Sequence, residues 1–303
     1  MTAMTGIGGT TGHSTAAAAA AETPRRPLCD DAEMSQPRFH FQRLDQDRFQ
    51  PTEYAQSHWG PDHLNGPAVV GLAAHVLEGC YGLDEFLPAR LTVDLFKAAR
   101  GVPTIAKTEL IRDGRRVRNS ECELTQDGVP VARAVLVQYR RAEAPRGTEW
   151  VRPSHFSIPP QLDEAPGINI GSDALGWTSA IADHQNADRK RTFNRTIDVV
   201  DDAPSSPFVR AAMTAEGTSL VTNLGTAGVG YINGDLTVAL SRLPVDDWIG
   251  LEADSHWAAD GIAVGAATLF DRDGAFGTGL VTAVSNPGAQ IDFADDPFPT
   301  RTR

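Results

Sequence analysis

Two stretches of the chain show the same succession of apolar and polar positions. In the first stretch, residues 39–49 alternate loosely and predict a strand, and residues 51–65 form a loop rich in Pro, His, Gly and Asn. The helix predicted at 66–79 is apolar on almost every face, which is typical of a buried helix. Alternating runs then predict a four-strand antiparallel meander with Asp-Gly hairpin turns, its strands at 90–96, 104–112, 116–125 and 129–140.

The second stretch repeats this order. Residues 192–200 predict a strand. Ser206 followed by Pro207 predicts the start of a helix, because a hydroxyl caps the first turn and proline suits the first helical position. We expect this helix to run over 206–223, and a second meander to begin at Tyr231.

The two stretches are also alike in sequence. Leu-Thr-Val at 91–93 recurs at 236–238, an offset of 145, and Asp-Gly at 127–128 recurs at 273–274, an offset of 146. An offset that changes by one residue over a whole unit indicates a duplicated module rather than a chance similarity. A duplicated fold can keep its chemistry in one copy and lose it in the other.

The repeat divides the chain into two halves. Five prolines and little periodicity between them predict a linker over the surface. Met34 is an alternative start to Met1. We predict a disordered tail at 1–36, a first half at 37–141, a linker at 142–182, a second half at 183–290 and a C-terminal tail at 291–303.

Composition narrows the possible partners. The 303 residues carry a net charge of −12 without a cluster of Lys or Arg, which disfavours nucleic acid and anionic membrane surfaces. No run approaches the roughly 18–20 apolar residues that cross a bilayer. Cys29, Cys80 and Cys122 lack the spacing of a metal or redox motif and are typical of reduced intracellular thiols, so we expect a cytoplasmic protein.

Motifs of several enzyme classes are missing. The sequence has no GxSxG, phosphate-binding loop, dinucleotide fingerprint or HExxH. His58 and His63 stand in the loop before the first helix, but two histidines without a third ligand are weak evidence for a metal, and we interpret them as surface residues. We expect no cofactor and no metal.

The motifs that remain resemble one family. The first half carries TELIRDG and DGVPVARAVLVQ, and the second carries DLTVALSRLPVDDW followed by DRDG. In this order and spacing, residues 39–286 resemble the double-hotdog acyl-CoA thioesterases, the thioesterase II-like and actinobacterial thioesterase-like proteins. The resemblance implies an α+β double hotdog, in which two antiparallel sheets are each wrapped around a central helix. It also implies hydrolysis of acyl-CoA to free acid and CoA, and association into a homo-oligomer.

The resemblance implies three catalytic positions. The family's Asp corresponds to Asp235, whose counterpart in the first half is Arg90. The family's Ser or Thr falls at Ser255 or His256, and its Gln falls at Thr282. These residues would orient and activate a water molecule. A Gln amide both donates and accepts, whereas Thr offers one short hydroxyl. Either Thr282 positions water less well, or another group substitutes, or this copy has drifted from efficient hydrolysis.

Two further places are candidates. The resemblance implies that Asn65 and Gly66 bring the helix N-terminus to the thioester, where free N–H groups stabilise an oxyanion, although the pair also suits a simple turn. Glu216 is a carboxylate in an apolar helix and needs a partner. Single-hotdog thioesterases often have an acid on this helix, and we rank Glu216 below Asp235.

Three functions are compatible with these residues. The first is acyl-CoA hydrolysis, with the CoA phosphates bound by arginines such as Arg112, Arg115, Arg116 and Arg242. The missing Gln suggests a second, an acyl-ligand binding protein without turnover. The third is an enoyl-CoA hydratase, which would require an Asp-His motif that the sequence does not show.

Overall fold

The computed structural model describes residues 37–160 and 167–295. The N-terminal tail at 1–36 and most of the C-terminal tail lie outside the described residues. The first half contains β1 (Phe39–Arg43), β2 (Arg48–Pro51), the short 3₁₀ helix η1 (Glu53–Ala55), α1 (Gly66–Tyr81), β3 (Phe86–Leu95), β4 (Thr104–Asp113), β5 (Val117–Gln126) and β6 (Val129–Arg140).

The second half begins within the predicted linker. Its elements are β7 (Gly167–Ser172), η2 (Ile181–His184), β8 (Lys190–Arg195), β9 (Asp198–Val200), α2 (Pro207–Glu216), α3 (Thr218–Asn223), β10 (Leu224–Gly225), β11 (Gly228–Val229), β12 (Tyr231–Asn233), β13 (Asp235–Leu240), β14 (Trp248–Ala259), β15 (Ile262–Asp271) and β16 (Gly274–Ser285), followed by η3 (Pro287–Ala289) and η4 (Phe293–Asp295).

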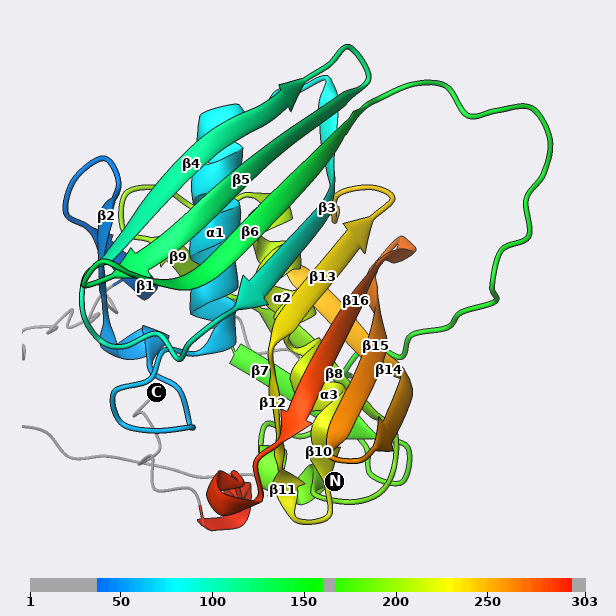
Figure 1. Ribbon diagram of the computed structural model, residues 1–303. Coiled ribbons are helices and arrows are strands. Elements are labelled where there is room, and N and C mark those ends of the chain that lie inside the picture. The colour runs from blue at the N-terminus through cyan, green and yellow to red at the C-terminus, as the bar shows by residue number, and fades with distance from the viewer. Residues whose placement is uncertain (1–36, 161–166, 296–303) are drawn as a thin grey trace, which may run out of the picture. The chain divides into compact units, whose positions relative to one another are not determined.

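The helices and largely antiparallel strands confirm the α+β class, and the strands of the two predicted sheets are joined edge to edge. Most of the described strands form one continuous sheet in the order β7-β8-β14-β15-β16-β13-β3-β6-β5-β4-β2-β1-β9, with β12 also paired to β16 (Figure 1). The strands β10 and β11 pair only with each other. The two halves join where β3 pairs with β13. The edge strands of the two halves meet because each would otherwise leave a row of unpaired N–H and C=O groups.

Strand order repeats between the halves. The first half runs β3-β6-β5-β4-β2, and the second runs β13-β16-β15-β14-β8. The predicted four-strand meanders need correction, because β3 lies beside β6 and not beside β4. Hairpin turns specify only the neighbours along the chain, so they predicted the β4-β5-β6 pairings and not the place of β3.

The junction shows the repeat directly. Thr92 pairs with Thr237 across β3 and β13, and their hydroxyl oxygens lie 3.1 Å apart. These two residues are also equivalent in the repeat, since their numbers differ by 145. Equivalent residues that face each other are the mark of an isologous, two-fold interface. The two halves are therefore related as two copies about an axis through this pair.

The helices lie on one side of the sheet and pack against each other (Figure 1). A Cβ at Gly71 of α1 would lie 2.8 Å from Met213 Cγ of α2, so glycine permits this close approach. One cluster of buried apolar side chains includes residues of both halves, such as Leu72, Leu91 and Leu236. The two halves thus share a core.

Three predicted elements are divided in the structure. The strand predicted at 39–49 becomes β1 and β2, which pair antiparallel with each other. The helix predicted at 206–223 breaks at Gly217, whose N–H donates to the carbonyl of Thr214 (3.0 Å) in a tighter turn. The strand predicted at 192–200 becomes β8 and β9, which lie far apart in the sheet. β8 lies between β7 and β14, and β9 is the edge strand at the other end, where it pairs in parallel with β1. Within the predicted linker, β7 pairs with β8.

Candidate functional site

A cavity of about 900 Å³ opens at the N-terminus of α1, between the two halves. Its size is that of a typical small-molecule site. Residues of both halves line it, and most of the side chains are apolar or aromatic, among them Tyr54, Trp59, Leu64, Val69, Leu95, Phe96, Ile181, Leu220, Val229, Ile232, Val284, Ile291 and Phe293.

The N-terminus of α1 forms one wall of this cavity. Asn65 caps the helix, its side-chain oxygen accepting the N–H of Ala68 (2.8 Å). Pro67 has no N–H. The N–H of Gly66 is therefore the first-turn donor left for a ligand, and it lies at the positive end of the helix dipole. Asn65 and Gly66 both line the cavity, and their role as a substrate-binding pair stays a prediction.

Glu216, the last residue of α2, faces this helix start. Glu216 is 9% exposed. Its side chain lies so close to Gly66 that a Cβ added at Gly66 would be 1.9 Å from Glu216 Oε1. Any other residue at position 66 would displace the carboxylate. The Asn233 amide donates to Oε1 (3.2 Å). The site therefore combines a helix start from the first half with an acid from the second.

Burial changes the chemistry of this carboxyl. Desolvation raises the pKa of Glu216 to about 7, although the hydrogen bond from Asn233 opposes the shift. A group with a pKa near neutrality exchanges protons readily at physiological pH, which is the requirement for a general base. Of the described residues that line the cavity, Glu216 is the only carboxylate.

Asp235 and Thr282 come together at a different place. The hydroxyl of Thr282 donates to Asp235 Oδ2, and its backbone N–H donates to Oδ1 (2.9 Å). Asp235 alternates with the buried Leu236 and Val238, so its side chain lies on the sheet face opposite the helices. Neither Asp235 nor Thr282 lines the cavity.

Ser255 and His256 lie apart from Asp235 and Thr282. Both are on β14, which is separated from β13 by β15 and β16. The ring of His256 contacts that of Tyr231, with centroids 6.0 Å apart. The structure thus brings together two of the four predicted catalytic residues and leaves Ser255 and His256 apart from them. Their catalytic roles stay predictions.

The histidines of the loop before α1 are not simply surface residues. His58 and His63 both line the cavity, and the ring of His58 packs edge-on against Phe293 at 5.5 Å. Sequence reasoning could not find this contact, because Phe293 is more than 200 residues away along the chain. Across residues 37–160 and 167–295, no three His, Cys, Asp or Glu side chains are grouped to hold a metal ion.

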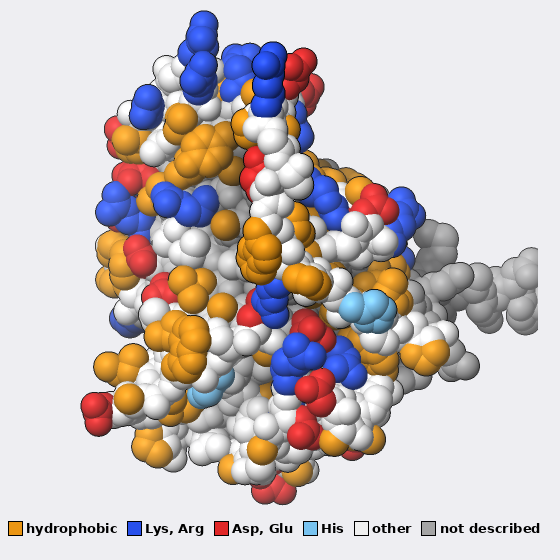
Figure 2. Space-filling view, turned by 90° about the vertical axis from the view of Figure 1, so that its right-hand side faces the viewer, with side chains coloured by type: hydrophobic (Ala, Val, Ile, Leu, Met, Phe, Trp, Pro, Cys, Tyr) orange, Lys and Arg blue, Asp and Glu red, His pale blue; other side chains and the backbone are white. Residues whose placement is uncertain are grey.

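The arginines expected to bind CoA phosphates lie elsewhere. Three of them, Arg112, Arg115 and Arg116, are exposed at the β4–β5 hairpin. Figure 2 shows basic side chains gathered at the top of the molecule in that view. This hairpin lies at the C-terminal end of α1, since the neighbouring Arg118 donates to the carbonyl of Tyr81 (2.6 Å). The cavity is at the opposite end of that helix, so the hairpin arginines do not border it.

These features define a class of protein: a two-copy α+β fold with a ligand cavity in which one copy contributes a helix start and the other an acid. The acyl-CoA thioesterase C-terminal domain matches residues 121–280, more than half of the chain, and the acyl-CoA thioesterase N-terminal domain matches residues 55–139. The chain belongs to the acyl-CoA thioesterase family.

Solved structures share the fold. An acyl-CoA thioesterase II from Mycobacterium marinum has a TM-score of 0.58 at 16% identity, covering 87% of this chain and 96% of its own. A tesB protein from Mycobacterium avium subspecies paratuberculosis has a TM-score of 0.59 at 16% identity, and the match covers 82% of this chain and 96% of that protein. A protein of unknown function with a hot dog fold, from Alicyclobacillus acidocaldarius, has a TM-score of 0.59 at 17% identity, and the match covers 80% of this chain and 95% of that protein.

No curated protein sequence is similar enough to the chain to count as a match. The family and the fold therefore rest on the domain matches and the solved structures. Among the helices of the described residues, none combines the length and the apolar character that crossing a bilayer requires.

Proposed function

We propose that the protein hydrolyses an acyl-CoA thioester to the free acid and CoA in the cavity at the N-terminus of α1. One observation carries the proposal: the buried carboxylate of Glu216 lies against Gly66, whose N–H is at the positive end of a helix. A base and an oxyanion donor on adjoining groups are what hydrolysis of a carbonyl compound requires. Membership of the acyl-CoA thioesterase family supports the substrate class.

The proposed reaction has two steps. The thioester carbonyl oxygen accepts the Gly66 N–H, and the oxygen of a water molecule forms a bond to the carbonyl carbon while Glu216 takes the water proton. The tetrahedral oxyanion then collapses, the C–S bond breaks, and the leaving sulfur receives a proton from the Glu216 carboxyl. Glu216 returns to its ionised form, and the acid and CoA depart.

Two carboxylates compete for the role of base. Activation of water by Asp235, together with Thr282 and Ser255 or His256, is the prediction from family resemblance. Glu216 is the better supported choice, because it lines the cavity and its pKa is raised to about 7 by burial. The carboxylate of Asp235 is occupied by two hydrogen bonds from Thr282.

We also propose that the chain is two hotdog units fused into one, related by the axis between Thr92 and Thr237. The repeated strand order supports this description. The acyl chain would lie against the apolar walls of the cavity, which both units supply.

The test uses two glycines of α1 in a CoA-release assay over acyl chains of increasing length. Gly66→Ala would place a Cβ 1.9 Å from Glu216 Oε1, so we expect kcat/KM to fall by about 10²-fold or more, as for loss of one oxyanion donor or its alignment. Gly79→Ala is the matched control, because a Cβ at Gly79 meets nothing within 4 Å. Equal activity of the two variants would contradict the site.

The assay also separates the alternatives. A wild-type protein that binds acyl-CoA and releases no CoA with any chain length would be an acyl-ligand binding protein. A protein that hydrates an enoyl-CoA without releasing CoA would be a hydratase. Either result would overturn the proposed hydrolysis.

A further inference from the structure

The two halves contain equivalent loops after their junction strands. In the first half, the N–H of Phe96 donates to the carbonyl of Val131 (3.0 Å). In the second half, the N–H of Ser241 donates to the carbonyl of Phe276 (2.9 Å). The donors differ by 241 − 96 = 145 and the acceptors by 276 − 131 = 145, so the two loops are anchored by the same bond.

A second anchor is equivalent as well, but its acceptor differs. The N–H of Arg100 donates to Gln126 Oε1 (2.8 Å), and the N–H of Val245 donates to Asp271 Oδ2 (3.0 Å). Both donor and acceptor are again offset by 145. The first half therefore has a neutral amide at the position where the second half has a carboxylate.

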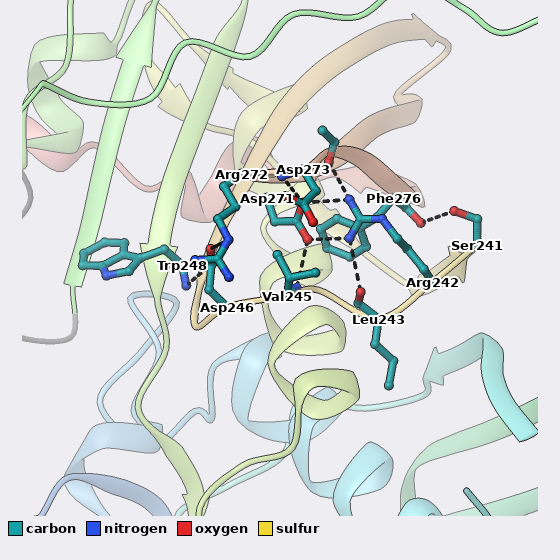
Figure 3. Close-up of polar contacts among 11 residues, drawn as sticks. Ser241, Arg242, Leu243, Val245, Asp246, Trp248, Asp271, Arg272, Asp273 and Phe276 are labelled. Atoms are coloured by element: carbon teal, nitrogen blue, oxygen red, sulfur yellow. Dashed lines mark hydrogen bonds and ion pairs between the residues drawn. The ribbon is translucent and has the colours of Figure 1, made fainter. Parts of the chain in front are cut away.

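The carboxylate of the second half holds an arginine (Figure 3). Arg242 donates to both oxygens of Asp271, at 2.5 and 2.7 Å, and to the carbonyls of Leu243 and Gly274, both at 3.2 Å. The Asp271 side chain is fully buried. A bidentate pair of this kind fixes the guanidinium, which is therefore unavailable to a ligand.

The residue equivalent to Arg242 in the first half is Lys97, since 242 − 97 = 145. Its counterpart acid is replaced by Gln126, whose amide donates to the carbonyls of Arg100 (2.8 Å) and Val102 (3.2 Å) and to the Thr104 hydroxyl (2.9 Å). Among residues 37–160 and 167–295, no carboxylate forms an ion pair with Lys97. The cation of the repeat is thus paired in one half and unpaired in the other.

Lys97 also lies where a substrate would pass. It lines the cavity and is exposed, so it stands at the mouth and not in the depth. Of the described residues that line the cavity, Lys97 alone is a lysine or arginine. An ammonium group at the mouth of an apolar cavity attracts an anion that the rest of this acidic protein repels.

We infer that Lys97 binds a phosphate group of the CoA portion of the substrate at the mouth of the cavity. The inference rests on the proposed function for the identity of the ligand. It follows that Lys97 contributes to binding and not to the chemical step, and that its effect requires the phosphates of CoA.

The test compares Lys97→Met with Lys107→Met, an exposed lysine on β4 that does not line the cavity. Each is assayed with one acyl group carried on CoA and on pantetheine, which has no phosphate. With the CoA ester, we expect Lys97→Met to raise KM about two- to fivefold, the range for one exposed charge pair, with kcat unchanged. With the pantetheine ester, all three proteins should be alike, and Lys97→Arg should restore the KM for the CoA ester.

Salt gives a second readout. KM for the CoA ester should rise with ionic strength in the wild type and much less in Lys97→Met. An unchanged KM in Lys97→Met would overturn the inference, as would an equal rise with both esters. A wild type that prefers a succinyl over a butyryl pantetheine ester, with the preference lost in Lys97→Met, would assign Lys97 to an acyl carboxylate and overturn it too.

Calorimetric titration with CoA itself separates this inference from the proposed function. If no thioester is hydrolysed but CoA binds more weakly to Lys97→Met than to Lys107→Met, the hydrolysis proposal fails and the phosphate contact stands. If CoA esters are hydrolysed and CoA binds all variants equally, hydrolysis stands and the phosphate contact fails.

Discussion

At the residue scale, one property of Glu216 explains both its reactivity and its place in the fold. The carboxylate is buried beside Gly66, and within the described part of the chain only the side chain of Asn233 donates a hydrogen bond to it. Burial without a cation disfavours the charged form and raises its affinity for a proton. The same desolvation that makes Glu216 costly to bury therefore suits it to the proposed role of a base near neutral pH.

This predicts a specific pH dependence. Because the pKa of Glu216 is raised to about 7, its carboxyl is protonated below that pH and cannot take a proton from water. We expect kcat/KM to fall about tenfold for each pH unit below 7 and to level off above it. Initial rates of CoA release between pH 5 and 9 would measure this profile. A kcat/KM that stays level from pH 9 down to pH 5, as for a carboxyl with an ordinary pKa near 4, would contradict the assignment.

The sequence predicted part of this site. The Ser-Pro and Gly-Pro signals were sufficient to predict where the two helices start, because capping depends on neighbours along the chain. The substrate-binding role of Asn65 and Gly66 came from the family resemblance and stays a prediction. Ranking Asp235 above Glu216 depended on a family position alone. The contact between Glu216 and Gly66 joins residues 150 positions apart, and neither hydrophobic period nor motif spacing encodes it.

At the scale of elements, the start of α1 determines where the proposed oxyanion donor, the Gly66 N–H, lies. Asn65 is held on both sides: its oxygen caps Ala68, and its amide nitrogen donates to the carbonyls of Tyr54 (3.1 Å) and Gln56 (3.3 Å). The loop before the helix and the helix itself are thus tied through one side chain.

We expect Asn65→Ala to lower the free energy of unfolding by about 1–2 kcal/mol, the usual cost of losing an N-cap. Urea denaturation would measure this change. Asn65→Ser keeps an oxygen for the cap but loses the amide donors, so it should recover part of the loss. If Asn65→Ala is as stable as the wild type, the side chain does not order the start of α1.

Local pattern was a good guide to some elements and a poor one to others. The Asp-Gly turns placed β4, β5 and β6 to within about a residue or two, because a tight turn determines the pairing of the strands beside it. The division into β8 and β9 was not predicted, because the residues of one short segment do not show that its two ends pair with different, distant strands. The pairing of β3 with β13 was not predicted either, because local pattern does not encode a contact between distant parts of the chain.

At the scale of the whole molecule, two-fold repetition has left the two helix starts unlike each other. At the start of α1, Gly66 is open to the cavity. At the start of α2, the N-cap hydroxyl of Ser206 donates to Glu78 of α1 and also accepts the N–H of Val209 (3.2 Å). The second start is therefore engaged by the protein itself.

We consequently expect one ligand site per chain. Equilibrium titration with CoA should give a stoichiometry close to one per chain, and Gly66→Ala should weaken that single binding event. Two equivalents bound per chain, or one equivalent that survives when Gly66 is replaced by a larger residue such as Val, would place a ligand outside the α1 cavity.

The central claim is that the acid of the second half, acting at the helix start of the first, performs the hydrolysis. The most direct measurement is kcat/KM for CoA release by Glu216→Gln and Asp235→Asn, each checked for folding, with Asp94→Asn as the control because Asp94 pairs with Asp235 across the junction. We predict a loss of about 10²–10⁴-fold for Glu216→Gln, the usual contribution of a positioned base, and little change for the other two. Full activity of Glu216→Gln together with an inactive Asp235→Asn would contradict the claim.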